Sequence, residues 1–290
     1  MTSASIQAGL LDTHQHLVFP DRFRYGWTDA VPALKSRSFT LQDYRNEAGS
    51  NNVSRSIFME TAVDEEYWQD ETRYVLSLAA DPDNRIAGVI AGCRPEHDAA
   101  AFDAWLDELD STAVVGFRRI LHTEPDELSA SSLFARNVRE LGKKGKTFDL
   151  CFLARQLPRA VSLVRRCEQT QFVLDHCGVP DIGSGNFAAW QEQIRQLAEF
   201  PHLNCKLSGL VAYCPDGLDP ETAVVPYLEH CAEAFGTERL VWGSDWPVCN
   251  TTAGLSRWLS IFRQFMTQAS RDTRDAVFRR NAERIYGVES

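Results

Sequence analysis

Two histidines and an aspartate stand at alternate positions near the start of the chain, in a D-x-H-x-H motif at positions 12–16. The motif follows two leucines, so it is typical of the C-terminal end of a β-strand. Side chains alternate along a strand, which puts Asp12, His14 and His16 on one face and Gln15 on the other. Imidazoles one strand repeat apart, roughly 6–7 Å between Cα atoms, can converge on one cation or one substrate oxygen. The alternative is a pair of ordinary, partly buried histidines.

Polar residues also end four later strand-like runs of the sequence. Each residue alone is a weak signal, because polar side chains occur at the ends of many strands. With the histidines of the first strand, these residues fall in phase at the same edge of five strands. Together they therefore indicate one site. These residues are Arg118 or Arg119, His176, Lys206 and Ser208, and Asp245.

Asp245 is the candidate general base. It follows the apolar run 240–242 and precedes Pro247, which cannot donate to a central ladder and so marks the end of the strand. A carboxylate between Trp242 and Trp246 is partly desolvated, and desolvation favours a role as a base. Nearby imidazoles or a metal would oppose that effect. The alternative is that Asp245 only caps the following turn.

The elements that would position these residues alternate regularly along the chain. Eight short strand-like runs are separated by amphipathic segments with helical spacing, and no Gly/Ser linker interrupts them. This alternation predicts a single α/β domain over residues 1–290, a (β/α)8 TIM barrel, whose site lies at the C-terminal ends of the strands. An open doubly wound sheet is the alternative, and it is weakened because no G-x-G-x-x-G motif follows a strand. The expected strands are 10–17, 54–60, 85–93, 114–121, 147–152, 171–178, 203–210 and 240–247, and the expected helices are 65–80, 99–109, 128–144, 157–169, 187–200, 220–235 and 281–286.

The longest connection, residues 18–53, follows the first strand. In a barrel it lies at the mouth of the site, where it could cover a substrate, although packing against the barrel is an equal alternative. Its aromatic residues are Phe19, Phe23, Tyr25, Trp27, Phe39 and Tyr44.

Several of the candidates have two possible orientations. The residues before His176 alternate so that it would face the interior at the mouth of the barrel, and Asp175 would then face the outer side; a core histidine is the alternative. Arg118 and Arg119 cannot both face inward. We favour Arg118 as the residue that binds an anion or a carbonyl, with Arg119 paired to helix carboxylates. Lys206 is either a deep interior charge or paired to a helix. The background histidines are His97, His122, His202 and His230.

Composition narrows the class of protein. The 290 residues are 44% hydrophobic with a net charge of -10, and the lack of a basic stripe argues against nucleic acid or an anionic membrane as partner. Residues 1–12 lack signal-peptide features, and no apolar run approaches the ~18–20 residues of a membrane span. Eight cysteines without a C-x-x-C pair predict buried free thiols and no structural zinc. We therefore expect a soluble cytoplasmic protein, in an oligomeric state that the sequence leaves open.

Taken together, the motifs resemble a known family. They are D-x-H-x-H at 12–16, D-H-C-G at 175–178, K-x-S-G-L at 206–210, G-S-D-W-P at 243–247 and N-A-x-R-x-Y-G at 281–287. This set resembles the amidohydrolase superfamily, and within it the amidohydrolase-2 branch that includes sugar-acid lactonases of the L-fuconolactonase and L-rhamnonolactonase types and 2-pyrone-4,6-dicarboxylate lactonase. The resemblance covers essentially the whole chain. It implies a (β/α)8 barrel that opens small lactones by hydrolysis, without specifying which lactone.

The resemblance also implies roles for individual residues. His14 and His16 match the strand-one pair, His176 the strand-six histidine, and Asp245 the strand-eight aspartate that handles the proton of water. Metal-rich members also carry a bridging carboxylate or carbamylated lysine on strand four and a histidine on strand five. Both are missing here, so a binuclear centre is not expected. The four matching residues could hold one Zn²⁺ with an open position, and because some lactonases of this branch work without metal, the requirement for zinc stays open.

The implied mechanism is hydrolytic. Asp245 would deprotonate a water that attacks the lactone carbonyl, while the three histidines, with or without a metal, polarise that carbonyl. The main alternative is a metal-dependent decarboxylase acting on an aromatic or unsaturated acid, and a third possibility is a barrel that binds sugar acids without catalysis. We expect substrate contacts from Arg118, Lys206 and Ser208 as polar groups and from Trp27 and Trp246 as apolar walls.

Overall fold

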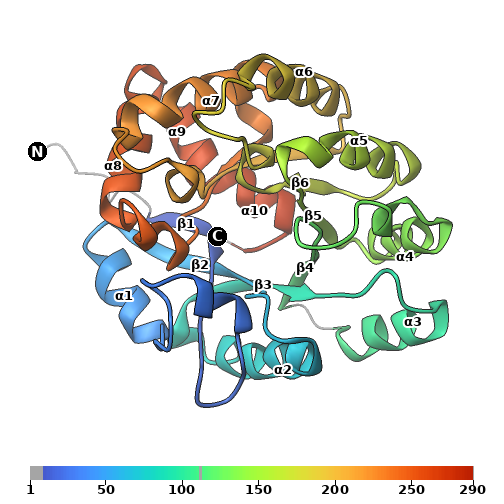
Figure 1. Ribbon diagram of the computed structural model, residues 1–290. Coiled ribbons are helices and arrows are strands. Elements are labelled where there is room, and N and C mark those ends of the chain that lie inside the picture. Colours follow the sequence, from blue (N-terminus) through green and yellow to red (C-terminus); the bar gives the residue numbers. More distant parts are fainter. Residues whose placement is uncertain (1–8, 111–112, 290) are drawn as a thin grey trace, which may run out of the picture.

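A computed structural model of the chain describes residues 9–110 and 113–289. Eight parallel strands pair in sequential order, β1 to β8, and helices surround them, which confirms the predicted TIM barrel (Figure 1). Residues 1–8, part of the segment in which no signal peptide is expected, lie outside the described residues. The strands are β1 Leu10–Gln15, β2 Val53–Met59, β3 Ile86–Gly92, β4 Val114–Ile120, β5 Thr147–Cys151, β6 Phe172–Leu174, β7 Leu203–Leu207 and β8 Leu240–Trp242.

The helices cover the outer face of the sheet, and all seven expected helices are present with small shifts at their ends. The sequence analysis missed three helices, Leu41–Gly49, Leu255–Phe265 and Arg271–Asp275. The first lies in the connection 18–53, where Thr40 and Asp43 form a reciprocal capping box that satisfies two free backbone N–H groups. The helices are α1 Leu41–Gly49, α2 Trp68–Ala79, α3 Ala99–Glu108, α4 Ser132–Lys143, α5 Leu157–Arg166, α6 Phe187–Ala198, α7 Pro220–Phe235, α8 Leu255–Phe265, α9 Arg271–Asp275 and α10 Asn281–Tyr286.

Strands β6 and β8 are shorter than predicted. β6 ends at Leu174 and β8 at Trp242, whereas the sequence pattern extended them to residues 178 and 247. The backbone turns left-handed at His176 (φ 52°), Cys177 (φ 55°) and Asp245 (φ 59°). A left-handed residue cannot continue a strand, so side-chain alternation no longer applies at these positions.

The barrel closes between β1 and the segment after β8. An isolated β-bridge joins Gln15 to Trp246. The backbone N–H of Asp245 donates to the carbonyl of His14, and that of His16 donates to the carbonyl of Trp246, both at 2.8 Å. Closure therefore places the aspartate of the last strand segment beside the two histidines of the first.

The interior of the barrel is layered. At the bottom, apolar side chains of the strands pack against α10, which lies near the centre of the ring in Figure 1. Above them, the buried ammonium of Lys206 lies between Asp149 and Asp175, and the hydroxyl of Tyr286 donates to Asp149 (3.0 Å). The histidines lie above this ionic layer, toward the mouth. Within the described ranges, no helix combines the length and apolar character that a membrane crossing requires.

Candidate active site

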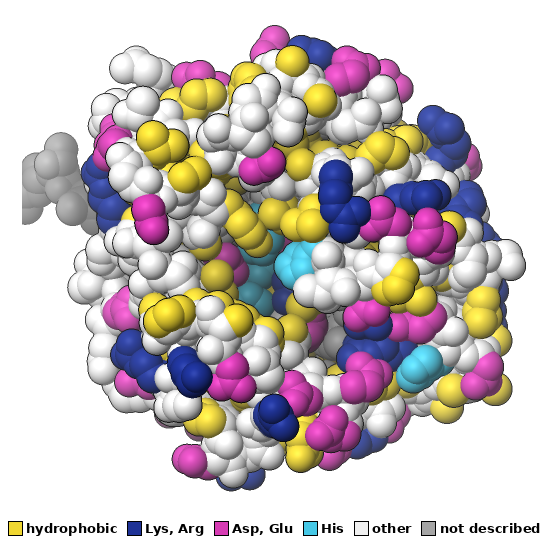
Figure 2. Space-filling model, in the orientation of Figure 1, with side chains coloured by type: hydrophobic (Ala, Val, Ile, Leu, Met, Phe, Trp, Pro, Cys, Tyr) yellow, Lys and Arg dark blue, Asp and Glu magenta, His cyan; other side chains and the backbone are white. Residues whose placement is uncertain are grey.

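A cavity of about 460 Å³ opens at the C-terminal ends of the strands. Figure 2 shows it as a central hollow in which histidine side chains are visible. His16, His176 and Asp245 line it together with Arg118 and Trp27. His14 lies directly behind them, fully buried.

His14, His16 and Asp245 form a compact triad at the base of the cavity. The Nε2 atoms of the two imidazoles are 3.1 Å apart, and Oδ1 of Asp245 is 3.6 Å from the first and 3.4 Å from the second. Ligands bound tetrahedrally to zinc at roughly 2.0–2.1 Å are themselves roughly 3.3 Å apart. The three donor atoms therefore already have the spacing of a mononuclear zinc site with an open position.

The hydrogen bond of His16 supports the same interpretation. Its Nδ1 is 2.9 Å from the carbonyl oxygen of Met59, so Nδ1 carries the hydrogen and Nε2 presents a lone pair to the site. Such a bond from the distal nitrogen is the usual way in which a protein orients a metal-binding imidazole. With the lone pair of His16 facing Nε2 of His14 at 3.1 Å, either a proton or a cation must lie between the two atoms.

His176 approaches the triad from the turn after β6. Its ring centroid is 4.5 Å from that of His14, and its Nδ1 is 2.9 Å from the hydroxyl of Ser208, which orients the ring. Gly209 permits this approach, because a Cβ at that position would collide with the imidazole of His176 and lie 2.9 Å from Oδ2 of Asp245. The glycine of the K-x-S-G-L motif is thus required by close contact with two site residues.

Burial favours the neutral form of the imidazoles of His14 and His176. It lowers the pKa of His14 well below its usual value, although the carboxylate of Asp175 opposes the shift. It also lowers the pKa of His176, with Asp245 opposing. Neutral imidazoles are the form that can accept hydrogen bonds or bind a metal.

The prediction for Asp175 is wrong. The residue does not face the outer side of the barrel: it is fully buried inside, 3.0 Å from Nζ of Lys206, 3.2 Å from the guanidinium of Arg118 and 3.5 Å from Nδ1 of His14. β6 has already ended at Leu174, so Asp175 and the left-handed residue after it both reach the interior. Burial alone would raise the pKa of Asp175, but Lys206 and His14 hold it well below its usual range.

Asp12 likewise departs from its predicted face. Its carboxylate accepts hydrogen bonds from Tyr44 of α1 (2.8 Å) and from the backbone of Ser244 (2.8 Å), away from the triad. The pairing of β1 with β2 shifts register between Asp12 and Gln15, which breaks strict alternation.

The structure places Arg118 inside the barrel. Its guanidinium donates to the carboxylate of Glu60 (2.7 Å) and lies 3.3 Å from Nε2 of His14, so the side chain that lines the cavity is already bound to protein groups. Arg119 also lines the cavity, at its rim, paired with Glu96 and Glu124. Those carboxylates belong to the loops after β3 and β4, not to helices as expected.

Of the other expected substrate contacts, Trp27 lines the cavity and donates from Nε1 to the carbonyl of Thr61 (2.9 Å). Lys206, Ser208 and Trp246 are fully buried and are not among the lining residues. Lys206 contacts the buried Asp175, and Ser208 contacts His176, which lines the cavity. Trp246 packs behind the site against aromatic side chains of the first loop and α1.

Glu60, Tyr213 and His122 are among the cavity residues that the sequence analysis missed. Glu60 directly follows β2 and pairs with Arg118, whereas Tyr213 follows β7 and has its ring centroid 6.1 Å from that of His176. His122 was treated as background although it lines the cavity. Its position four residues after Arg118, at a strand end and in the same phase, was a signal that could have identified it. Burial and the positive charge of Arg118 lower the pKa of His122 to about 4.

The buried free thiols were expected, but their arrangement was not. Cys177, Cys205 and Cys231 converge within 4.8 Å in the core, outside the cavity. Residues far apart in sequence build this cluster, so the absence of a C-x-x-C pair says nothing about it.

Comparison with known proteins agrees with this geometry. A family model described as amidohydrolase matches residues 11–288. The chain is 29% identical to an L-fucono-1,5-lactonase from Burkholderia multivorans over 96% of both chains, and 22% identical to an L-rhamnono-gamma-lactonase from Scheffersomyces stipitis over 60% of this chain and 59% of that one. An amidohydrolase from Burkholderia multivorans, solved with bound zinc, superposes with a TM-score of 0.88 over 97% of this chain and all of that one, at 29% identity.

More distant structures share the fold alone. A 2-pyrone-4,6-dicarboxylic acid hydrolase from Pseudomonas putida, so named provisionally, has a TM-score of 0.74 at 20% identity over 98% of this chain and 100% of that one. A 5-carboxyvanillate decarboxylase from Sphingomonas paucimobilis has a TM-score of 0.69 at 17% sequence identity, over 98% of this chain and 100% of that one. The full-length family match, together with the histidine–aspartate site at the mouth of the barrel, shows that the chain belongs to the amidohydrolase-2 family.

Proposed function

We propose that this protein hydrolyses a small lactone, of the class formed by sugar acids. The observation that carries the proposal is the convergence of His14, His16 and Asp245 at the base of one cavity. The similarity to L-fucono-1,5-lactonase over nearly the whole chain supports the substrate class.

In the proposed reaction Asp245 takes a proton from water as the oxygen of that water bonds to the lactone carbonyl carbon. Collapse of the tetrahedral intermediate breaks the bond between this carbon and the ring oxygen, and Asp245 returns the proton to the departing oxygen. The product is the open hydroxy acid. His14 and His176 stay neutral, and the hydroxyl of Ser208 holds His176 toward the cavity.

The site residues also suit a metal. His14, His16 and Asp245 would hold one Zn²⁺, which would supply Lewis acidity to a carbonyl or a water. The donor spacing and the orientation of His16 by Met59 support this assignment. Bound zinc in the related Burkholderia multivorans structure is consistent with it.

The remaining residues have supporting roles in this proposal. Trp27 forms an apolar wall, and Arg118 offers one edge of its guanidinium to substrate while it holds Glu60 and Asp175 in place. Lys206 acts from below, because its ammonium compensates the charge of Asp175. Trp246 acts by packing behind the triad.

A panel of aldono-1,5- and aldono-1,4-lactones, assayed with a pH indicator, tests the proposal. Opening of a lactone at neutral pH releases one proton and no CO2. Release of CO2 from an aromatic or unsaturated acid, with no acidification from any lactone, would instead identify a decarboxylase. Binding of sugar acids without turnover of any lactone would identify a barrel that has lost catalysis.

A further inference from the structure

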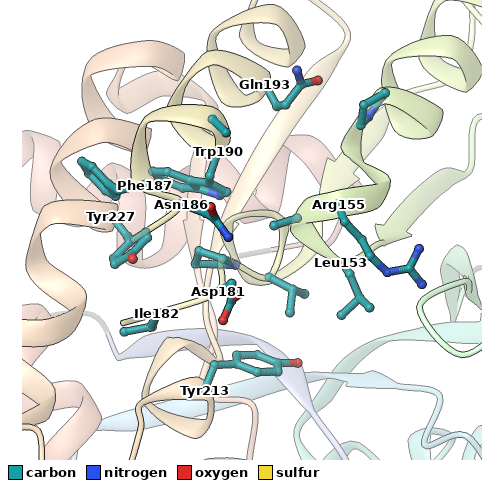
Figure 3. A pocket seen from close by; sticks show the side chains of 15 residues that line it. Leu153, Arg155, Asp181, Ile182, Asn186, Phe187, Trp190, Gln193, Tyr213 and Tyr227 are labelled. Atoms are coloured by element: carbon teal, nitrogen blue, oxygen red, sulfur yellow. The ribbon is translucent and has the colours of Figure 1, made fainter. Parts of the chain in front are cut away.

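A second cavity, of about 540 Å³, lies beside the active-site cavity. Its lining comes from the loops after β5 and β6, from the first turns of α6, and from Tyr213 and Tyr227. Figure 3 shows Phe187, Trp190 and Tyr227 on one side and Leu153 and Arg155 on the other, with Tyr213 beneath them. We call this cavity the aromatic groove.

Tyr213 lines both cavities and forms the partition between them. The same two loops contribute to each side: Cys151 and His176 line the active-site cavity, whereas Leu153 and Val179 line the groove. The groove therefore begins where the site ends, so a molecule whose reacting end lies near His176 could extend past Tyr213 into it.

The floor of the groove is apolar. Trp190 and Tyr227 are almost fully buried and pack against Phe187, with ring centroids 4.9–5.5 Å apart. Val179 and Ile182, also buried, extend this surface. Aromatic and aliphatic surface of this kind favours an apolar group, because its burial removes apolar area from water.

The polar residues of the groove lie mainly at its exposed rim. Arg155 is paired with Asp126 at 2.8 Å, so its charge is already compensated and the groove is not built for an anion. One acceptor in the lining is buried: Oε1 of Gln193 has no hydrogen-bond partner among the described residues. It would accept a hydrogen bond from a donor carried by the occupant.

We propose that the aromatic groove is a specificity subsite that takes an apolar, preferably aromatic, substituent of the lactone whose ring lies in the active-site cavity. This inference rests on the proposed function and extends it: the preferred substrate is a substituted lactone, larger than an unsubstituted sugar lactone. Tyr213 is the residue that the substituent passes.

Two probes test the subsite: a hexono-1,5-lactone and its 6-O-benzyl ether. In the wild-type protein the benzyl ether should have a kcat/KM roughly tenfold or more above that of the parent, as expected for burial of a phenyl group. Ala189→Trp should abolish this advantage and leave the parent lactone unchanged, since Ala189 is an exposed residue that lines the groove.

Ala188→Trp is the matched control. Ala188 is the exposed neighbour of Ala189 on α6 and does not line the groove, so this variant should keep the full preference. A wild-type protein that prefers the parent lactone, or an Ala189→Trp variant that keeps the benzyl preference, would overturn the proposal.

The ring-opened acids separate this inference from the proposed function. If neither lactone is hydrolysed, the proposed function fails, but binding of hexonate and 6-O-benzyl hexonate can still be compared by calorimetry. Tighter binding of the benzyl acid by wild type and Ala188→Trp, lost in Ala189→Trp, supports the subsite without turnover. Equal affinities in all three proteins would reject it.

Discussion

The backbone N–H of Asp245 donates a 2.8 Å hydrogen bond to the carbonyl of His14, across the seam where the barrel closes. Together with the hydrogen bond from His16 to the carbonyl of Trp246, this contact joins the first and last strand segments at the height of the site. It holds the carboxylate of Asp245 3.6 Å from Nε2 of His14, so the geometry of the site depends on barrel closure.

The first prediction concerns the proposed base. Asp245→Asn should lower kcat on the true lactone by at least about 10²-fold, because an amide cannot take a proton from water, while circular dichroism and the melting temperature stay near those of wild type. Asp216→Asn, in an exposed loop, is the control and should be fully active. Near-normal turnover by Asp245→Asn would remove its assigned role.

The second prediction concerns metal. Purified protein should contain about one zinc per chain, measured by elemental analysis, and chelation should remove both the zinc and the activity, which added Zn²⁺ should restore. His16→Ala should bind less zinc because it loses one of three donors, whereas His97→Ala, at an exposed position outside the cavity, should keep it. Full activity of protein proven to be stripped of metal would show that the histidines and Asp245 suffice alone.

The third prediction concerns the ionic layer under the site. Lys206→Met leaves Asp149 and Asp175 buried without their shared cation, so the free energy of unfolding should fall by about 3–5 kcal/mol. Urea denaturation measures this change. In the control, Arg73→Met breaks an exposed ion pair with Glu108 and should cost under about 1 kcal/mol. Similar losses in the two variants would contradict the importance of the buried layer.

The fourth prediction concerns pH and the buried Glu71 of α2. Burial, and next the charge of Glu60, raise the pKa of Glu71 to about 8. The folded protein therefore holds a proton that the unfolded chain releases above its ordinary pKa. Stability should fall as pH rises from about 4.5 to about 8, by up to about 1.4 kcal/mol per pH unit.

Glu71→Gln removes that titration. Its melting temperature should exceed that of wild type at pH 8 and approach it near pH 5, where both side chains are neutral. Thermal melts across this range provide the measurement. A wild-type and a variant profile that run parallel from pH 5 to pH 8 would show that Glu71 does not titrate in this way.

Local pattern was sufficient for the architecture. Apolar alternation with a period of two and helical spacing near 3.6 depend only on neighbouring residues, and these periods predicted eight strands, most of the helices and the edge at which the polar residues lie. They also predicted the pairing of His14 with His16, because two positions on one strand lie side by side in any sheet. Three helices were missed. The weakly amphipathic sequence of α1 was hidden among the aromatic residues of a long connection, and α8 and α9 lie between the last strand and the final helix, where no helix was expected.

The amino-acid sequence by itself determined the order of the strands and of most helices and some of the residues at the mouth, since these follow from short-range periodicity. Only the tertiary structure decided where side chains point once a strand has ended. At Asp175 and His176 a left-handed turn brings both residues inward, and at Lys206 two distant carboxylates select the interior over a helix face. The physical reason is that these orientations are set by contacts between residues far apart in the chain, whose energies no local pattern encodes.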